Sequence, residues 1–181
     1  MRNMFLTCLI LLAGFSNVQA QTRPTQSTGI FRPSDNLFTI AFPTTPSVAK
    51  DSLPSSTGAP YQRMTYSYQS NSNMLRIGVL YISRGQPVGD DEQAALLEAS
   101  VKSLIDGMPA FVPDKNGGVS NALLDGHYGK RIQGINNGAG VYAALYATPR
   151  HLFVVQGYYD PGNPAAKTAT EAFVNSLKIT D

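Results

Sequence analysis

Tyrosine and arginine are the residue types through which this sequence most directly suggests binding chemistry. The chain has nine Tyr and no Trp, and most of the Tyr lie in segments that alternate apolar and polar residues. Tyrosines that share an uncovered sheet face form an aromatic platform for a protein or a glycan, whereas a helix over that face makes the rings core. The candidate binding residues are Tyr66, Tyr68, Tyr142, Tyr146 and Tyr158, with Arg131 as an anchor for an anionic group.

Patterns typical of catalysis or metal binding are scarce. No serine lies in a Gly-x-Ser-x-Gly motif, a usual setting of a nucleophilic serine in a hydrolase. His127 and His151 lack the spacing of metal ligands on one element, although Asp125 would join them if their strands were adjacent. The acidic run 90–92 is explained by its place at the start of a predicted helix. We therefore expect no enzymatic activity, no metal and no cofactor.

Residues 1–20 have the pattern of a secretory signal peptide. Arg2 precedes an apolar run over residues 4–13, and Val18-Gln19-Ala20 places small residues at a cleavage site. The run is shorter than the roughly 20 residues that a transmembrane helix needs. We expect cleavage after Ala20 and a bacterial protein of the periplasm or the medium, with no membrane span after cleavage. The only cysteine, Cys8, leaves with the signal, so the expected mature chain is free of cysteine.

The charge balance gives no sign of a partner recruited by electrostatics. The chain of 181 residues carries 14 Lys and Arg against 12 Asp and Glu, a formal net charge of +2. Charged residues make up 14% of it, against about 25% in an ordinary globular protein. We therefore expect no nucleic-acid partner.

The order of predicted elements places the candidate residues on an antiparallel sheet. Residues 21–36 are rich in Gln, Thr, Ser and Pro and are predicted to be a flexible leader, so a single domain is expected over 37–181. Alternating segments joined by short turns that contain Gly, Asn or Pro predict antiparallel strands. These strands are expected over 37–42, 61–69, 74–83, 119–124, 128–135, 141–148 and 151–159, with a further edge strand at 48–53.

Two helices are predicted from apolar residues at helical spacing. The first begins at Asp90, which would form a capping box with Gln93, and it ends near Gly107. The second has Asn163 as its cap and Pro164 at its first position. The predicted fold class is therefore α+β: a six- to seven-stranded antiparallel sheet flanked by two main helices, in a layered α/β/α sandwich.

Two short phrases resemble the PsbP-like family of exported bacterial proteins. The strand near residue 40 ends in Phe42-Pro43 with a second proline at Pro46, and the last helix ends in a Phe-x-x-Ser-hydrophobic-Lys phrase over residues 173–178. The resemblance covers residues 31–181. It implies the fold shared by the extrinsic P subunit of photosystem II and a small Ran-binding nuclear factor, and the role of a protein-binding accessory module. The matching positions are core and turn residues, so the resemblance assigns no functional residue.

The leading functional hypothesis is an exported, non-catalytic accessory module that binds an unidentified protein in the cell envelope. The alternative is a secreted small-ligand-binding protein or a hydrolase. Its site would lie near the 43–60 loop or the 84–90 segment, with Arg63, Arg84 or Arg131 as the anchor for an anion.

Overall fold

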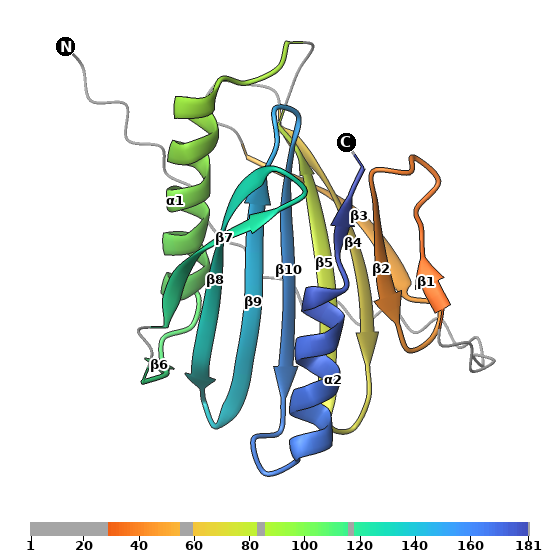
Figure 1. Ribbon diagram of the computed structural model, residues 1–181, viewed down its shortest axis with the longest axis vertical. Coiled ribbons are helices and arrows are strands. Elements are labelled where there is room, and N and C mark those ends of the chain that lie inside the picture. The colour runs from red at the N-terminus through yellow and green to blue at the C-terminus, as the bar shows by residue number, and fades with distance from the viewer. Residues whose placement is uncertain (1–28, 55–59, 83–85, 116–117, 181) are drawn as a thin grey trace.

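An eight-stranded antiparallel sheet forms the centre of the computed structural model, which describes residues 29–54, 60–82, 86–115 and 118–180 (Figure 1). The strands follow the order β3-β4-β5-β10-β9-β8-β6, and β7 pairs with β8 beside β6. Their bounds are β3 Ser47–Leu53, β4 Tyr61–Gln69, β5 Asn73–Tyr81, β6 Phe111–Pro113, β7 Val119–Leu124, β8 His127–Asn136, β9 Ala139–Ala147 and β10 His151–Tyr159.

Two-residue turns set the register of the hairpins that were predicted from Gly and Asn. Asp125 and Gly126 both have positive φ angles, and so do Asn137 and Gly138. Two successive positive φ values form the type I′ turn, whose twist matches that of the flanking strands. The turns pair Leu124 with His127 in the β7–β8 hairpin and carry β8 directly into β9.

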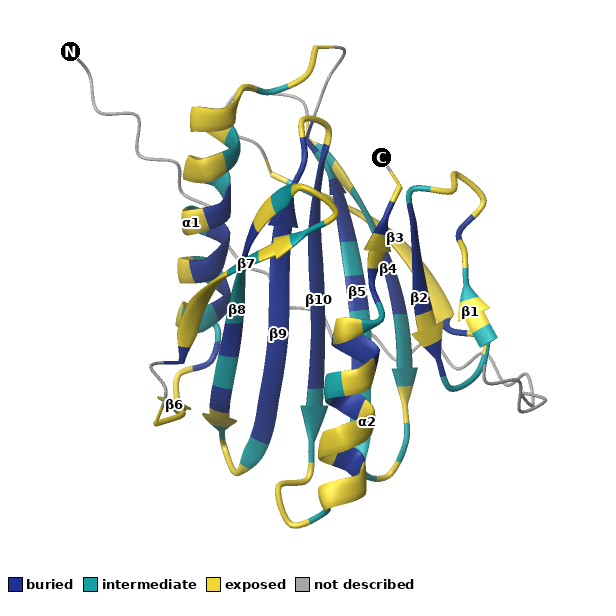
Figure 2. Cartoon of the chain, in the orientation of Figure 1, coloured by how far each residue is buried: buried dark blue, intermediate teal, exposed yellow. Residues whose placement is uncertain are grey.

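The two helices lie on opposite faces of this sheet, and strand β9 shows why. Tyr142, Ala144 and Tyr146 point toward α2 (Pro164–Asn175), whereas Val141, Ala143 and Leu145 point toward α1 (Asp90–Asp106). Successive side chains of a strand point to opposite faces, so a strand covered on both sides is apolar throughout. Almost the whole of β9 is buried, as its dark blue ribbon shows in Figure 2. The described residues therefore form an α+β fold with two helices, as predicted.

A second sheet of three strands packs beside α2 on the same face of the large sheet. It has the order β1-β2-β11, with β1 Gly29–Phe31, β2 Phe38–Phe42 and β11 Lys178–Ile179. The ring of Phe38 lies 5.6 Å from Tyr66 of β4 and 6.1 Å from Phe153 of β10, measured between centroids. Aromatic pairs at such separations stabilise a core beyond their buried area.

Three short strands were not predicted, and they change the strand count and the start of the fold. The large sheet has eight strands rather than six or seven, because it includes β6 and the edge strand β3. The strand predicted over 37–42 is not part of it, since it lies in the small sheet as β2. Part of the predicted flexible leader is ordered: β1 begins at Gly29, and the Phe31 ring packs 5.1 Å from that of Tyr66. The predicted signal peptide and residues 21–28 lie outside the described residues.

The two helix starts differ from each other. Asn163 caps α2 as predicted, since its Oδ1 accepts a hydrogen bond from the Ala166 N–H at 3.1 Å. The capping box predicted at α1 is wrong: the cap residue is Gly89, and no side chain accepts a backbone N–H there. The Gln93 side chain instead donates to the Val88 carbonyl at 3.0 Å. Neither helix, nor any other within the described ranges, has the length and apolar character needed to cross a membrane.

Candidate functional site

Three of the five candidate tyrosines are core residues. The exposed fractions of Tyr66, Tyr142 and Tyr146 are 6%, 5% and 4%. Helix α2 and the small sheet cover this face, and all three rings join the aromatic and aliphatic cluster beneath them. The predicted exposed platform is therefore not formed by these residues, because the amphipathic helix takes the position that a partner would need.

The other two candidate tyrosines do not form a platform either. Tyr68 is half-buried against the same cluster, whereas Tyr158 lies on the opposite face and packs against the α1 cluster. Burial raises the pKa of the Tyr158 hydroxyl, which lies 3.9 Å from the Met108 sulfur. The candidate tyrosines are thus divided between the two sides of the sheet.

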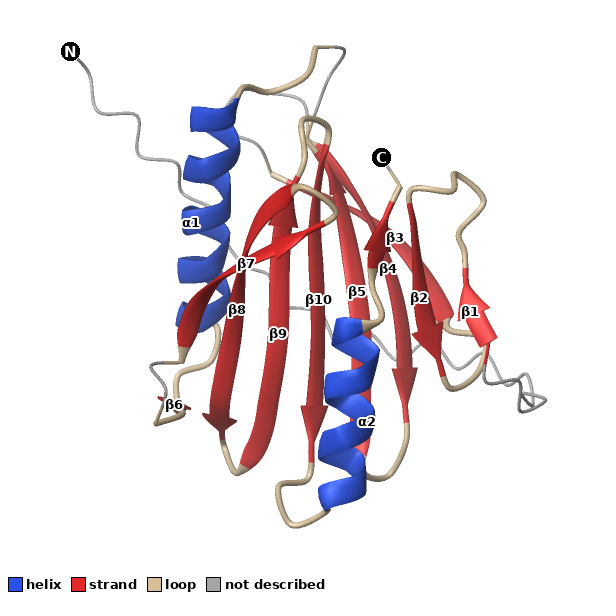
Figure 3. Ribbon diagram, in the orientation of Figure 1, coloured by secondary structure: helices blue, strands red, loops and turns tan. Residues whose placement is uncertain are grey.

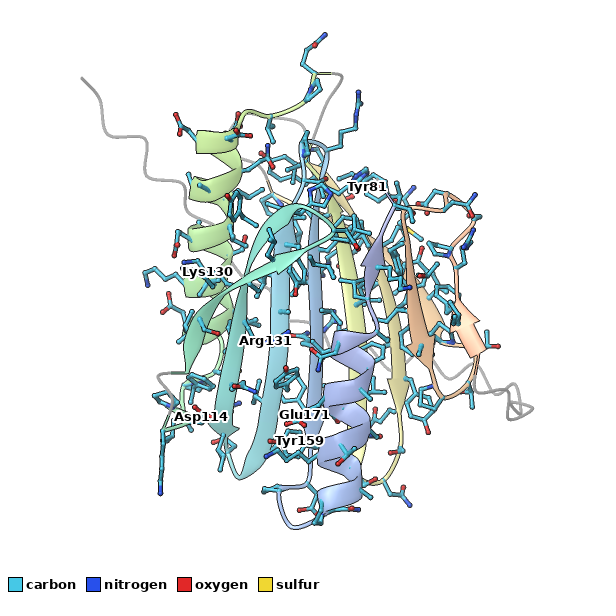
Figure 4. The ribbon with its side chains drawn as sticks, viewed as in Figure 1. Tyr81, Asp114, Lys130, Arg131, Tyr159 and Glu171 are labelled. Carbon is cyan, nitrogen blue, oxygen red and sulfur yellow. The ribbon has the colours of Figure 1, made fainter. Side chains whose placement is uncertain are left out.

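Arg131 of β8 lies near the end of α2 (Figure 4). It comes together there with Tyr142 and Tyr146. Its guanidinium carbon lies 5.5 Å from the centre of the Tyr142 ring, and its Nη2 donates to the Asn175 Oδ1 at 3.0 Å. The Tyr142 hydroxyl donates to the same oxygen at 3.3 Å. Asn175 is the last residue of α2, where a cation stabilises the negative end of the helix dipole. This position gives Arg131 a structural role without a ligand.

Two residues of the hypothesised metal site, Asp125 and His151, make other contacts. The Asp125 Oδ2 accepts the Ile179 N–H at 2.9 Å, and the buried His151 ring packs 5.0 Å from that of Tyr81. The Tyr81 hydroxyl donates to the Asp35 Oδ2 at 2.6 Å. Across the described ranges, no three His, Cys, Asp or Glu side chains are grouped so that they could hold a metal ion.

Of the arginines proposed as anion anchors in the alternative hypothesis, Arg63 is paired with an acid. The Arg63 Nε donates to the Asp51 Oδ1 at 2.8 Å, across the β3–β4 pair, and this hydrogen bond lowers the pKa of the Asp51 carboxyl. Arg84 and part of the 43–60 loop lie outside the described residues.

The sequence also contains Ser47-x-x-Lys50, a spacing found in enzymes with a catalytic serine. Both residues lie on β3, where positions three apart point to opposite faces.

A groove of about 790 Å³ lies between α1 and the β7–β8 hairpin. Figure 3 shows the two sides, with α1 as the blue helix at the left and the hairpin strands beside it. The lining comes from Asp90, Gln93, Ala94, Leu97 and Glu98 of α1, from residues 121–123 and 126–130 of the hairpin, and from Ala147 and Pro149. None of the six candidate binding residues lies in it, whereas His127, considered above as a metal ligand, does.

The groove forms because strand β7 of the β7–β8 hairpin packs against the α2 side of the sheet and not against α1. Helix α1 packs on β9 and β8, but Ala122 and Leu124 of β7 pack against the α2-side cluster. The contact between Asp125 and the Ile179 N–H ties the hairpin tip to β11 on that side. The first residues of β8 therefore diverge from the first turns of α1.

Exposed apolar side chains concentrate at this edge of the molecule. Of the seven large hydrophobic residues that are exposed in the described ranges, five belong to β6, β7 and β8: Val112, Val119, Leu123, Tyr128 and Ile135. Leu123 and Tyr128 line the groove, are directly paired across the hairpin, and are 67% and 80% exposed. Exposed apolar residues gathered at a groove mark an interaction site more often than scattered ones do.

The polar part of the groove is one ion pair and the start of α1. The Lys130 Nζ lies 2.7 Å from the Glu98 Oε1, joining β8 to the helix (Figure 4). The Glu98 side chain is nevertheless 63% exposed. Asp90, at the first position of α1, lines the end of the groove.

A smaller hollow of about 390 Å³ lies at the other end of the sheet, where three turns meet. Its lining includes Ser70, Asn71 and Asn73 of the β4–β5 turn and Asn137 of the β8–β9 turn. Apart from Met74 and parts of Tyr158 and Tyr159, this hollow offers few apolar side chains.

The sequence contained one signal for the groove that the prediction did not use. Strand β7 is apolar on both faces, with Val119 and Leu123 on one and Ala122 and Leu124 on the other. A strand at a sheet edge needs only one apolar face for the core. The second apolar face indicates either a further covering element or a binding surface.

Comparison with known protein families and with curated proteins finds no match to this chain.

Proposed function

We propose that this chain is an exported, non-catalytic binding module that holds a segment of a protein partner in the cell envelope. The observation that carries the proposal is the groove between α1 and the β7–β8 hairpin, with Leu123 and Tyr128 exposed at its side. Apolar and aromatic side chains in a concave site supply most of the binding energy in protein–protein interfaces. A groove of about 790 Å³ has the size of sites that bury a short peptide segment or a drug-sized ligand.

The rigidity of the groove favours this role. One wall is a helix of 17 residues and the other is a hairpin paired over six residue pairs. A site on preformed elements loses little conformational entropy on binding, so more of the contact energy appears as affinity. The exposed Tyr128 ring is a suitable anchor, because a tyrosine offers a large contact area with few rotatable bonds.

Export and the finer fold assignment belong to the same proposal. The apolar run 4–13 and the small residues before Gln21 support cleavage after Ala20 and a location in the bacterial periplasm or the medium. The layered α/β/α sandwich of the PsbP-like family is supported by two helices on opposite faces of an antiparallel sheet. In that family the resemblance implies an accessory, protein-binding role.

The test uses a double variant of the two exposed groove residues, Leu123→Ser with Tyr128→Ser. Purified mature protein on beads is incubated with solubilised envelope fraction of its own bacterium, and bound proteins are identified by mass spectrometry. A partner that is recovered with the wild-type protein is then purified, and its affinity for the wild-type protein and for the double variant is measured by calorimetry. We expect the double variant to weaken this affinity at least tenfold, since two anchor side chains are truncated.

The matched control is Val48→Ser on β3, which removes an exposed apolar residue at the opposite edge of the sheet. All three exposed positions are expected to change the free energy of unfolding by at most about 0.5 kcal/mol, so that loss of binding is not loss of fold. A partner that binds the double variant as tightly as the unchanged chain contradicts the proposed site.

A further inference from the structure

The apolar part of the groove sets one requirement on what occupies it. Leu97 of α1 is 5% exposed at the floor, while Leu123 and Tyr128 stand exposed at the hairpin side. Ala94 and Ala147 keep the space between them open because their side chains are short. An occupant that is to displace water from these surfaces must bring apolar side chains of its own.

The charged groups set a second requirement. Among the lining residues, Asp90 and Glu98 are acids, Lys130 is a cation, and His127 counts as neutral at pH 7 in the formal charge. Lys130 already forms an ion pair within the protein, since its Nζ lies 2.7 Å from the Glu98 Oε1, and its side chain is only 21% exposed. Glu98 lines the groove and its side chain is 63% exposed, so its carboxylate has room for a second cation.

The acids on α1 extend beyond the lining itself. Asp91 and Glu92 continue the first turn of α1 beside Asp90. Three acids at a helix start are explained by the helix dipole, but Glu98 lies more than two turns further on, where the dipole offers no explanation. Two acids against one paired base give the lining a formal charge of −1. A negative wall attracts cationic partners and repels acidic ones.

From these two requirements we infer that the partner segment is an apolar peptide that carries Lys or Arg, with one cation against Glu98 and a second against Asp90, about 12 Å further along α1. This inference rests on the proposed function, because it names the chemistry of the segment that the same groove holds. The Glu98–Lys130 pair then acts as a selectivity element: Lys130 competes with the cation of the partner for the Glu98 carboxylate.

The test begins with a random dodecapeptide display library selected on the full mature protein. Each round includes removal of peptides that bind the Leu123→Ser/Tyr128→Ser variant, so that only groove binders remain. We expect the surviving peptides to be enriched in apolar residues and to carry more Lys and Arg than Asp and Glu. The strongest of them is then synthesised for affinity measurements by fluorescence anisotropy.

The affinity of that peptide is measured on charge variants of the groove. Exposed ion pairs contribute modestly, so Asp90→Asn and Glu98→Gln are each expected to weaken binding about threefold and together about tenfold. Lys130→Gln is expected to act in the opposite direction and to tighten binding about threefold, because it releases Glu98. Asp106→Asn is the matched control: it removes an acid of the same helix that lies outside the groove and pairs with Lys102.

The outcomes separate the two proposals. Groove binders that are acidic or without charge bias, or Lys130→Gln that weakens binding, would overturn the inference and leave the proposed function intact. A selection that yields no peptide able to distinguish the unchanged chain from the Leu123→Ser/Tyr128→Ser variant overturns the proposed function, and with it the inference.

Discussion

Burial and one short hydrogen bond govern the tyrosine hydroxyls of this molecule. Burial raises the pKa of Tyr81, and its hydrogen bond to Asp35 raises it further. Burial also raises the pKa of Tyr66, Tyr146 and Tyr159, although nearby cations partly oppose this at the last two. All these shifts have the same direction, so the folded protein holds tyrosine protons that the unfolded chain would release.

Stability is therefore expected to fall in alkaline solution. The unfolded chain loses its tyrosine protons near the ordinary pKa of 10.0, while folded Tyr81 still holds its proton well above that value. Between about pH 8 and pH 9 the tyrosines are protonated in both states and add no pH dependence; above about pH 10 the unfolded chain releases protons that the folded protein keeps, so the free energy of unfolding falls. Urea unfolding between about pH 8 and pH 11 measures this, and Tyr81→Phe should lose less stability over that interval than the unchanged chain. Equal losses in both proteins would contradict the role of Tyr81.

At the scale of elements, the two helices are held in different ways. Helix α2 has a side-chain cap and a proline at its start, and its buried residues include Phe173 and Val174. Helix α1 starts at Gly89 without a side-chain cap, and its acids lie on the solvent side and along the groove. The start of α1 is thus the less supported wall of the proposed binding site.

Cap substitutions should act in opposite directions at the two helices. Asn163→Ala removes the acceptor of the Ala166 N–H and is expected to cost about 1 kcal/mol of unfolding free energy. Gly89→Ser supplies an acceptor where none exists and is expected to add a few tenths of a kcal/mol, since an added Cβ meets no atom within 4 Å. Chemical denaturation of both variants measures the difference. A loss of stability at Gly89→Ser would show that the start of α1 does not accept an ordinary cap.

At the scale of the whole molecule, the small sheet covers the part of the large sheet's face that α2 does not cover. Phe31 of β1 lies with its ring centroid 5.8 Å from Phe42 and 5.1 Å from Tyr66, so it joins the small sheet to the large one. The Asp35–Tyr81 hydrogen bond makes a second link between the β1–β2 connection and the large sheet. Residues 29–36 therefore belong to the packed domain.

Shortening the chain from its N-terminus should separate the leader from the domain. A mature chain that begins at Gly29 is expected to unfold at the same denaturant concentration as one that begins at Gln21. A chain that begins at Pro33 loses β1 and the Phe31 ring, and it should be less stable by about 2 kcal/mol, less than for a fully buried phenylalanine. Equal stability of all three chains would mean that β1 adds nothing to the fold.

Local patterns in the sequence determined most of the elements of this protein. The alternation in β4, β7 and β10, the positive-φ turn residues, and the Asn163 cap are all set by neighbours in the chain, so their bounds were predicted closely. The strands β1, β6 and β11 were missed because they have two or three residues each, too few for an alternating pattern, and form only by pairing with longer strands.

Tertiary structure alone decided which side chains are available for binding. Alternation places Tyr142 and Tyr146 on one face, but only the packing of α2 and the small sheet shows that this face is covered. In the same way, the spacing of Leu123 and Tyr128 gives no sign of Leu97 and Glu98 across from them. The groove arises from the divergence of a hairpin from a helix, and that divergence depends on contacts such as Asp125 to Ile179, 54 residues apart in the chain.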